Sequence, residues 1–225
     1  MFLKVTELAS VAGVDERTVL GWIKNMGLPA HKQDDRYRIN RVDLLEWATN
    51  HDMTIPPEIY IVNNETGRLA TVSGAIRKGG IFYDLPGDTP ESALREVVSR
   101  LALPPSLDPE FLLQTLLARE TLGSTALGNG IAIPHVRNPI VGQSGESAIS
   151  LCFLKNPIDF DAVDGKPVTI LFTLVTPNVK EHLHLLAKLA FLLHDHPFQE
   201  LLHRPGGEDE IMTAICELEE PILRR

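Results

Sequence analysis

The stretch that decides the fold is ARETLGSTALGNGIAIPHVRNP, residues 118–139. It joins the end of an expected helix, which carries Arg119, to a loop rich in glycine, serine and threonine. A mainly apolar run over residues 130–136 follows and has the composition of a buried β-strand. Pro134 stiffens the backbone directly before His135 and so limits where the imidazole can point. We therefore expect His135 at the end of a strand, at a sheet edge that a partner protein can reach.

The segments on both sides of this stretch alternate between helical and strand-like patterns, which indicates an α/β domain beginning at about Leu69. A short helix is expected to end at Gly79-Gly80, and two more begin with a capping residue and a proline, at Thr89-Pro90 and Asp108-Pro109. The expected strands are Ile81–Leu85, Gly130–Val136, Ala148–Leu154 and Val168–Val175, and the later helices are Val179–Asp195, Pro197–His203 and Glu208–Leu218.

Several common enzyme motifs are missing from the sequence. Gly128-Asn129-Gly130 lacks the third glycine of a dinucleotide fingerprint, because Ile133 stands in its place. There is no G-K-[ST] phosphate loop and no G-x-S-x-G nucleophile elbow. The chemistry must therefore come from the polar loop, the strand and the Pro-His pair that follows them.

Residues 118–139 closely resemble the EIIA domain of the phosphotransferase system, of the fructose, mannitol and nitrogen-regulatory type. Two further segments carry the resemblance: FDAVDGKPV at residues 160–168, and His182-Leu183 after Leu174–Pro177. The likeness spans about Leu69 to Leu218. It implies a central mixed β-sheet with helices on both faces.

The resemblance also assigns roles. His135, in the G-x-A-I-P-H motif, is implied to be the phosphoryl acceptor, and His182 is implied to hydrogen-bond its imidazole. The implied donor is the phosphocarrier protein HPr or its nitrogen-branch relative. Many members of the family have Gly-Lys after the acceptor, whereas Val136-Arg137 follow it here, which leaves the donor preference open.

Physical chemistry supports a phosphoryl acceptor at this place. A neutral imidazole can attack phosphorus at cytoplasmic pH, and the site then has to position the groups and stabilise the equatorial oxygens. Arg119 can supply a bidentate pair of donors, and Ser124 in the Gly/Ser/Thr loop can add another. Each has an ordinary alternative role. Arg119 could complement a helix C-terminus, Ser124 could only form a turn, and His182 could be a core residue.

The first 51 residues are expected to form a second, separate domain, which we call the head. Helices are expected at Thr6–Ala12, with Leu8 and Val11 on the inner side, and from Asp15 to Asn25, around a turn at Gly13. A hairpin strand, Arg36-Tyr37-Arg38-Ile39, and a third helix, Val42–Thr49, complete a winged helix-turn-helix. The string from Thr6 to Ala48 resembles the MerR/excisionase-like helix-turn-helix family.

This head implies DNA as a partner, although some members of such families contact proteins instead. The expected contacts lie on the second helix and on the ribbon: Arg17, Thr18, Gly21, Lys24, Lys32, Arg36 and Arg38. The head holds as many acidic as basic side chains, and the net charge of −9 comes from the rest of the chain. A neutral head with few phosphate contacts is expected to need a homodimer for binding at physiological salt. Residues 52–68, with Pro56-Pro57, are expected to be a linker to the body at residues 69–225.

The composition and residue spacing argue against disulfide-rich, membrane-spanning, secreted and metal-binding classes of protein. The two cysteines, Cys152 and Cys216, fit a reducing cytoplasm better than a disulfide framework or a zinc finger. No apolar run approaches the length of a membrane span, and the N-terminus has no signal-like core. His182 and His184 are two apart on a helix and point in different directions, and no cysteine pair or carboxylate-histidine repeat completes a ligand set, so no metal site is expected. No cofactor is expected either.

The sequence thus predicts a cytoplasmic regulator in which a phosphoryl-accepting EIIA body controls a DNA-binding head. Two alternatives stay open: a phosphoryl-transfer component that serves a separate sugar permease, and a regulator that binds a protein target.

Overall fold

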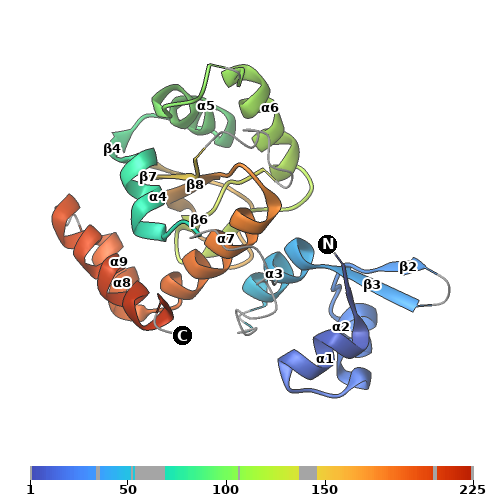
Figure 1. Cartoon of the computed structure of the whole chain (residues 1–225). Helices are drawn as coiled ribbons and strands as arrows, with labels where there is room; N and C mark the ends of the chain where they lie inside the picture. The colour runs from blue at the N-terminus through green and yellow to red at the C-terminus, as the bar shows by residue number, and fades with distance from the viewer. Residues whose placement is uncertain are drawn as a thin grey trace. The chain divides into compact units, whose positions relative to one another are not determined.

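The computed structural model describes residues 2–33, 36–51, 53, 69–105, 107–136, 146–204 and 207–223 (Figure 1). The chain divides into two compact units, Met1–Thr66 and Gly67–Arg225. Arg137 and most of the expected linker lie outside the described residues. The two units are called the head and the body below.

The head has the order β1 (Phe2–Lys4), α1 (Val5–Ala12), α2 (Glu16–Asn25), β2 (His31–Gln33), β3 (Arg36–Asn40), α3 (Arg41–Asn50). Its antiparallel sheet has the strand order β1-β3-β2. Gly13 ends α1 with a φ of 67°, and the Asp15 side chain accepts the Thr18 N–H at the start of α2. Both features match the expected helix-turn-helix.

The core of the head is built around two tryptophans. The rings of Trp22 on α2 and Trp47 on α3 lie 5.5 Å apart between centroids. Val11, expected on the inner side of α1, is instead 39% exposed. Leu8 and Ala9 form the buried side of this short helix, and the helical period turns Val11 away from their common direction. Strand β1 was not expected from the sequence.

The body contains a five-stranded mixed sheet with the order β4-β7-β8-β6-β5. The strands are β4 (Ile81–Leu85), β5 (Ala126–Gly128), β6 (Ile131–Ala132), β7 (Ala148–Ile158) and β8 (Val168–Val175). Strand β8 pairs parallel with β6 and antiparallel with β7, whereas β4 pairs parallel with β7. The helices are α4 (Val72–Gly79), α5 (Pro90–Arg100), α6 (Pro109–Glu120), α7 (Val179–Leu193), α8 (His196–His203) and α9 (Glu208–Leu223).

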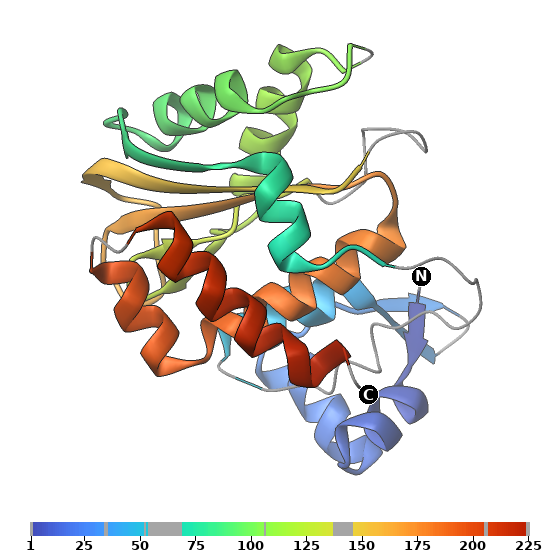
Figure 2. The same cartoon turned by 60° about the vertical axis from the view of Figure 1, so that its left-hand side comes forward.

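Helices cover both faces of this sheet. Helices α5 and α6 lie on one face, and α4, α7 and α9 lie on the other (Figure 2). On the first face, Leu94 and Leu112 from the helices pack in one buried cluster with Leu171 from β8. Burial of such side chains is the main stabilising contribution to the layers. The expected α/β class, with helices on both faces of a mixed sheet, is confirmed.

The expected strand Gly130–Val136 is shorter than predicted. Regular pairing covers only Ile131–Ala132, and His135 makes an isolated bridge to Leu174 on β8. Pro134 has no N–H to give to the ladder, although its carbonyl accepts the Leu174 N–H at 3.0 Å. The interruption leaves His135 at the carboxyl end of β6, beside the end of β8.

Strand β5 was missed. Asn129 and Gly130 both have positive φ, 50° and 74°, and connect β5 to β6 as a tight hairpin. An Asn-Gly pair is the strongest short-range signal for such a turn. Because β5 and β6 are antiparallel, with Ala126 opposite Ala132, the hairpin places the loop at residues 121–125 beside the end of β6 that leads to His135.

Candidate functional site

The imidazole of His135 is held in one orientation by its own backbone neighbour. It is 3% exposed, and its Nδ1 lies 2.7 Å from the carbonyl oxygen of Ile133. A carbonyl oxygen can only accept, so Nδ1 carries the proton of the neutral ring. The lone pair of the neutral ring is therefore on Nε2.

A second buried histidine contacts this ring. His182 is fully buried, and its ring centroid lies 5.3 Å from that of His135 at an interplanar angle of 42°. Asn178 caps α7 by accepting the Glu181 N–H at 2.9 Å, so the helix begins at Val179 and His182 lies in its first turn. The β8–α7 connection thus brings the two expected histidines together, and the positive end of the α7 dipole lies close to them.

The loop before β5 is held by side chains of its own segment. Arg119, which is buried at the end of α6, donates from Nη1 to the Gly123 carbonyl at 2.8 Å. Glu120 accepts the Thr125 N–H at 2.9 Å and the Thr125 hydroxyl at 2.6 Å. The carbonyl of Thr125 in turn accepts the Ile133 N–H at 3.0 Å. A continuous chain of hydrogen bonds therefore leads from α6 to the residue that orients His135.

Ser124 has a structural task in this loop. Its hydroxyl donates to the carbonyl of Phe160, and its oxygen accepts the Ala126 N–H at 3.0 Å. The first bond ties the polar loop to the FDAVDGKPV segment. Glu120, which sequence reasoning did not single out, carries the connection to His135 together with Thr125 of the same polar loop. A carboxylate five residues before a threonine is too common a spacing to reveal it.

The other histidine of the pair on α7 points elsewhere, as the sequence predicted. His184 hydrogen-bonds the backbone of Ala70, where the described part of the body begins. Burial lowers its pKa to about 4, and the neighbouring Lys188 adds to this effect. His182 and His184 therefore link α7 to two different places: the His135 ring and the first residues of the body.

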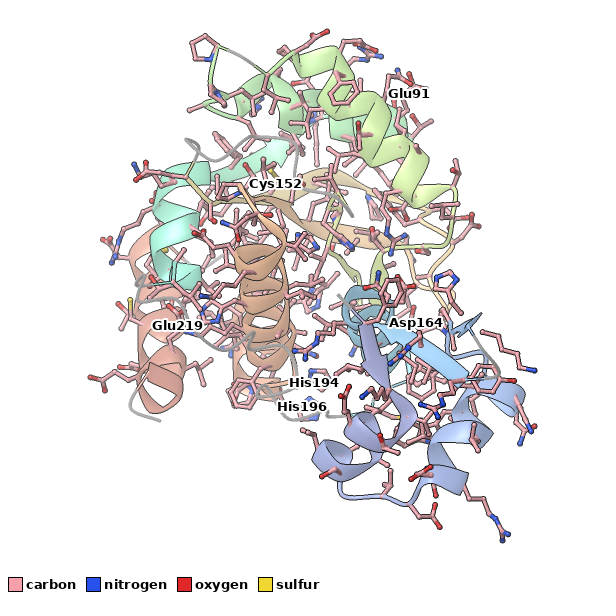
Figure 3. The ribbon with its side chains drawn as sticks, turned by 45° about the vertical axis from the view of Figure 1, so that its right-hand side comes forward. Glu91, Cys152, Asp164, His194, His196 and Glu219 are labelled. Atoms are coloured by element: carbon pink, nitrogen blue, oxygen red, sulfur yellow. The ribbon has the colours of Figure 1, made fainter. Side chains whose placement is uncertain are left out.

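A buried ion cluster secures the same first residues. Glu219, which is labelled in Figure 3, is 1% exposed. It accepts the N–H groups of Val72 at 2.6 Å and Ser73 at 2.9 Å. These donors are the unsatisfied amides at the start of α4, where a carboxylate is favoured by the helix dipole. Lys188 is also buried and interacts electrostatically with Glu219. Helices α4, α7 and α9 thus meet at one charged cluster.

Other potential chemistry is limited in the parts of the chain that the structure describes. No group of three histidine, cysteine or carboxylate side chains there could hold a metal ion. Burial raises the pKa of the Cys152 thiol to about 12, so it has little thiolate character. No helix among these residues is long and apolar enough to cross a membrane.

The expected DNA-contact residues divide by exposure. Arg17, Thr18 and Lys24 are exposed on α2, and Gly21 between them is half-buried. The Thr18 hydroxyl donates to Asp15 at 2.6 Å and so belongs to the helix cap. On the ribbon, Lys32 and Arg36 are exposed, and Arg38 is half-buried.

Comparison with known families identifies both parts of the chain. The family described as "Phosphoenolpyruvate-dependent sugar phosphotransferase system, EIIA 2" matches residues 75–217, and a helix-turn-helix domain family matches residues 2–52. This protein belongs to the EIIA type-2 family and carries an additional helix-turn-helix domain.

Two relatives illustrate the likeness of the body. The "Nitrogen regulatory protein" of Pseudomonas aeruginosa is 42% identical over 145 residues, which is 63% of this chain and 92% of the relative. The protein of the same name from Escherichia coli is 37% identical over 128 residues, which is 55% of this chain and 77% of the relative.

Solved structures agree with the fold. The nitrogen regulatory protein IIA-Ntr from Neisseria meningitidis has a TM-score of 0.55 and 32% identity, covering 61% of this chain and 93% of that one. IIA mannitol from Escherichia coli has a TM-score of 0.51 and 24% identity, covering 61% and 96%, which supports the fold alone.

Proposed function

We propose that this protein is a cytoplasmic regulator whose body accepts a phosphoryl group on Nε2 of His135 from an HPr-like phosphocarrier. One observation carries the proposal. The bond from Nδ1 to the Ile133 carbonyl leaves the lone pair on Nε2, and a second buried histidine lies 5.3 Å away between ring centroids. Membership of the EIIA type-2 family supports the same chemistry.

The reaction needs little from the protein beyond position and charge. The P–N bond to the carrier breaks as a new P–N bond to His135 forms, and three equatorial oxygens carry the charge through the transition state. His182 and the N-terminus of α7 can stabilise those oxygens, and burial strengthens such hydrogen bonds. Arg119 supports the loop and adds positive charge at the end of α6.

The direct test is phosphoryl transfer from a panel of purified carriers. The wild-type chain should take up one acid-labile, base-stable phosphate, and His135→Ala should take up none. His196→Ala is a matched control, because that histidine is exposed at the start of α8. Full labelling of His135→Ala would show that another residue is the acceptor.

We further propose that the head binds DNA, through the exposed side of α2 and the β2–β3 ribbon. The support is the helix-turn-helix family match and the exposure of Arg17, Lys24, Lys32 and Arg36. A selection of genomic fragments at low salt should enrich a defined sequence. If the same sequence is still enriched by an Arg17→Ala, Lys24→Ala double variant, DNA does not bind through the exposed side of α2.

Helix α7 is a route by which phosphorylation can influence the head. Its residue His182 contacts the acceptor ring, and His184, two positions later, contacts Ala70, before which the chain leads to the head. A small movement of α7 on phosphorylation would therefore reach the junction directly. Coupling of this kind commonly changes affinity by about 5–150-fold.

The coupling is tested by comparing operator affinity between the unmodified and phosphorylated chains. The two forms should differ in the wild type and converge in His184→Ala, which keeps the acceptor His135. Equal affinities in the two wild-type forms would mean that the domains are only tethered.

A further inference from the structure

A buried threonine lies behind the second histidine of the site. Thr176 follows the last residue of β8, is completely buried, and has its Oγ1 3.4 Å from Nδ1 of His182. Within the residues that the structure describes, this imidazole nitrogen is the hydrogen-bond partner of the Thr176 hydroxyl. Which of these two atoms donates in this contact depends on the tautomer of His182.

A buried hydroxyl with one imidazole partner is best satisfied when it donates. If the hydroxyl accepted instead, its own proton would stay buried without a partner, which is the costlier arrangement. Nδ1 of His182 is then the acceptor, and the proton of the neutral ring is on Nε2. The contact also limits rotation of the ring about its χ2 angle.

The two histidines then have complementary proton positions. His135 carries its proton on Nδ1, because that atom donates to the Ile133 carbonyl, and its Nε2 has the lone pair. His182 carries its proton on Nε2 and can donate it. One ring is prepared to attack, and the other is prepared to hydrogen-bond the group that is transferred.

We propose that Thr176 is a positioning residue that holds His182 as the Nε2–H form, oriented to donate to a phosphoryl oxygen on His135. The proposal rests on the proposed role of His135 as the acceptor. Thr176 acts only through His182 and does not touch the reacting atoms.

The variants are Thr176→Val, which keeps the shape and removes the hydroxyl, and Thr176→Ser, which restores the hydroxyl. Thr173→Val is the matched control. Thr173 lies three residues earlier, on β8, and is equally buried, and among the described residues its Oγ1 has no hydrogen-bond partner. Removing the Thr173 hydroxyl should therefore leave transfer unchanged.

The first readout is independent of activity. In the unmodified wild-type chain, the ¹⁵N chemical shifts of His182 should show a protonated Nε2 and an unprotonated, accepting Nδ1. Thr176→Val should move the Nδ1 shift and mix the two proton positions, and Thr176→Ser should restore the wild-type spectrum. A wild-type spectrum with the proton on Nδ1 of His182 would overturn the proposal even if His135 proves to be the acceptor.

The second readout is the rate of phosphoryl transfer to His135. Thr176→Val should slow it about three- to tenfold, which corresponds to one net hydrogen bond, with rescue in Thr176→Ser. Equal rates in wild type and Thr176→Val would overturn the proposal, as would equal losses in Thr176→Val and Thr173→Val. If the wild type takes up no phosphate, the proposed function fails, and the nitrogen shifts still decide the proton position of His182.

Discussion

The carboxylate of Glu219 accepts the backbone N–H of Ser73 at 2.9 Å, across 146 residues of sequence. The last helix of the body thus completes the first turn of its first helix, next to the point where the chain comes from the head. Removing this carboxylate would leave the two amides without their acceptor. It would also remove the negative charge that favours the cation of the buried Lys188.

Glu219→Ala should therefore lower the free energy of unfolding of the body by about 3 kcal/mol, because two buried amides lose hydrogen bonds to a charged group, each worth about 1.5–3 kcal/mol. Urea denaturation followed by circular dichroism measures this change. Glu217→Ala is the control, because Glu217 is exposed on the same helix, and its effect should stay within about 0.5 kcal/mol. Equal stabilities of the two variants would contradict the importance of the cluster.

The stability of the body should also depend on pH through His184. Its pKa is about 4 in the folded chain, against an ordinary value of 6.5, because burial and the charge of Lys188 disfavour the cation. Between these values the unfolded chain binds a proton that the folded chain does not. The contribution of His184 is therefore complete above pH 6.5 and is lost as the pH falls toward 4.

The expected loss over this window is about 1–2 kcal/mol, smaller than the full shift would imply because the half-buried ring keeps part of its hydration. Lys180, Lys188 and Glu219 are the charged groups that influence His184. Urea midpoints at pH 7 and pH 5 should differ more for the wild type than for His184→Asn. An identical pH dependence in the two proteins would exclude His184 as its source.

Replacing Arg119 or His182 should slow phosphoryl transfer to His135 without removing the residue that carries the phosphate. Arg119→Ala removes the donor to Gly123 and a positive charge, and His182→Ala removes the neighbouring ring. Loss of one such group typically slows a reaction on the order of 10²-fold. Stopped-flow transfer from the carrier gives the rates, and near-ultraviolet circular dichroism checks that the fold is intact.

Arg95→Ala is the control for Arg119. Arg95 pairs with Glu91 and Glu110 on the exposed side of α5 and α6, so its removal changes charge without touching the site. Its transfer rate should equal that of the wild type. If Arg119→Ala also transfers at the wild-type rate, the arginine only stabilises the end of α6.

The two cysteines should differ in reactivity. Cys152 is fully buried on β7, and its pKa is raised to about 12, whereas Cys216 on α9 is partly exposed. Ellman's reagent should therefore modify Cys216 in the native protein and reach Cys152 only after denaturant is added. Cys216→Ser isolates the buried thiol, and rapid native labelling of that variant would show that β7 opens easily.

Local signals predicted much of this fold, and they worked where the structure depends on near neighbours. Thr89 and Asp108 cap α5 and α6 as expected, because a capping side chain needs only the next turn. The opposite directions of His182 and His184 follow from the helical period alone. The break at Pro134 was missed because a proline was considered as a stiffener and not as a lost donor.

Contacts between distant segments could not be predicted in the same way. The bonds from Glu219 to Val72 and Ser73 depend on how α9 is laid over α4, which no local pattern records. The proposed role of Thr176 could not be predicted locally either, because it depends on a single hydrogen bond to His182. The hairpin at Asn129-Gly130, in contrast, does have a local sequence signal, because an Asn-Gly pair favours a tight turn between two strands.

Gly21 gives a test that separates stability from recognition in the head. It lies in the middle of α2, and a Cβ added there would meet nothing within 4 Å. Glycine in a helix interior is less favourable than alanine by about 0.5–1 kcal/mol, so Gly21→Ala should raise the stability of the head by about that amount. The gain would be measured by thermal unfolding followed by circular dichroism.

If α2 approaches DNA closely, the same methyl group should weaken operator binding although the head is more stable. Affinity measured by fluorescence anisotropy should then fall in Gly21→Ala, while Gly27→Ala serves as the comparison. Gly27 lies beyond the end of α2 with a φ of 72°, so alanine there should cost stability through strain and leave binding per folded molecule unchanged. A Gly21→Ala variant that is more stable and binds as tightly as the wild type would move the DNA contact away from this part of α2.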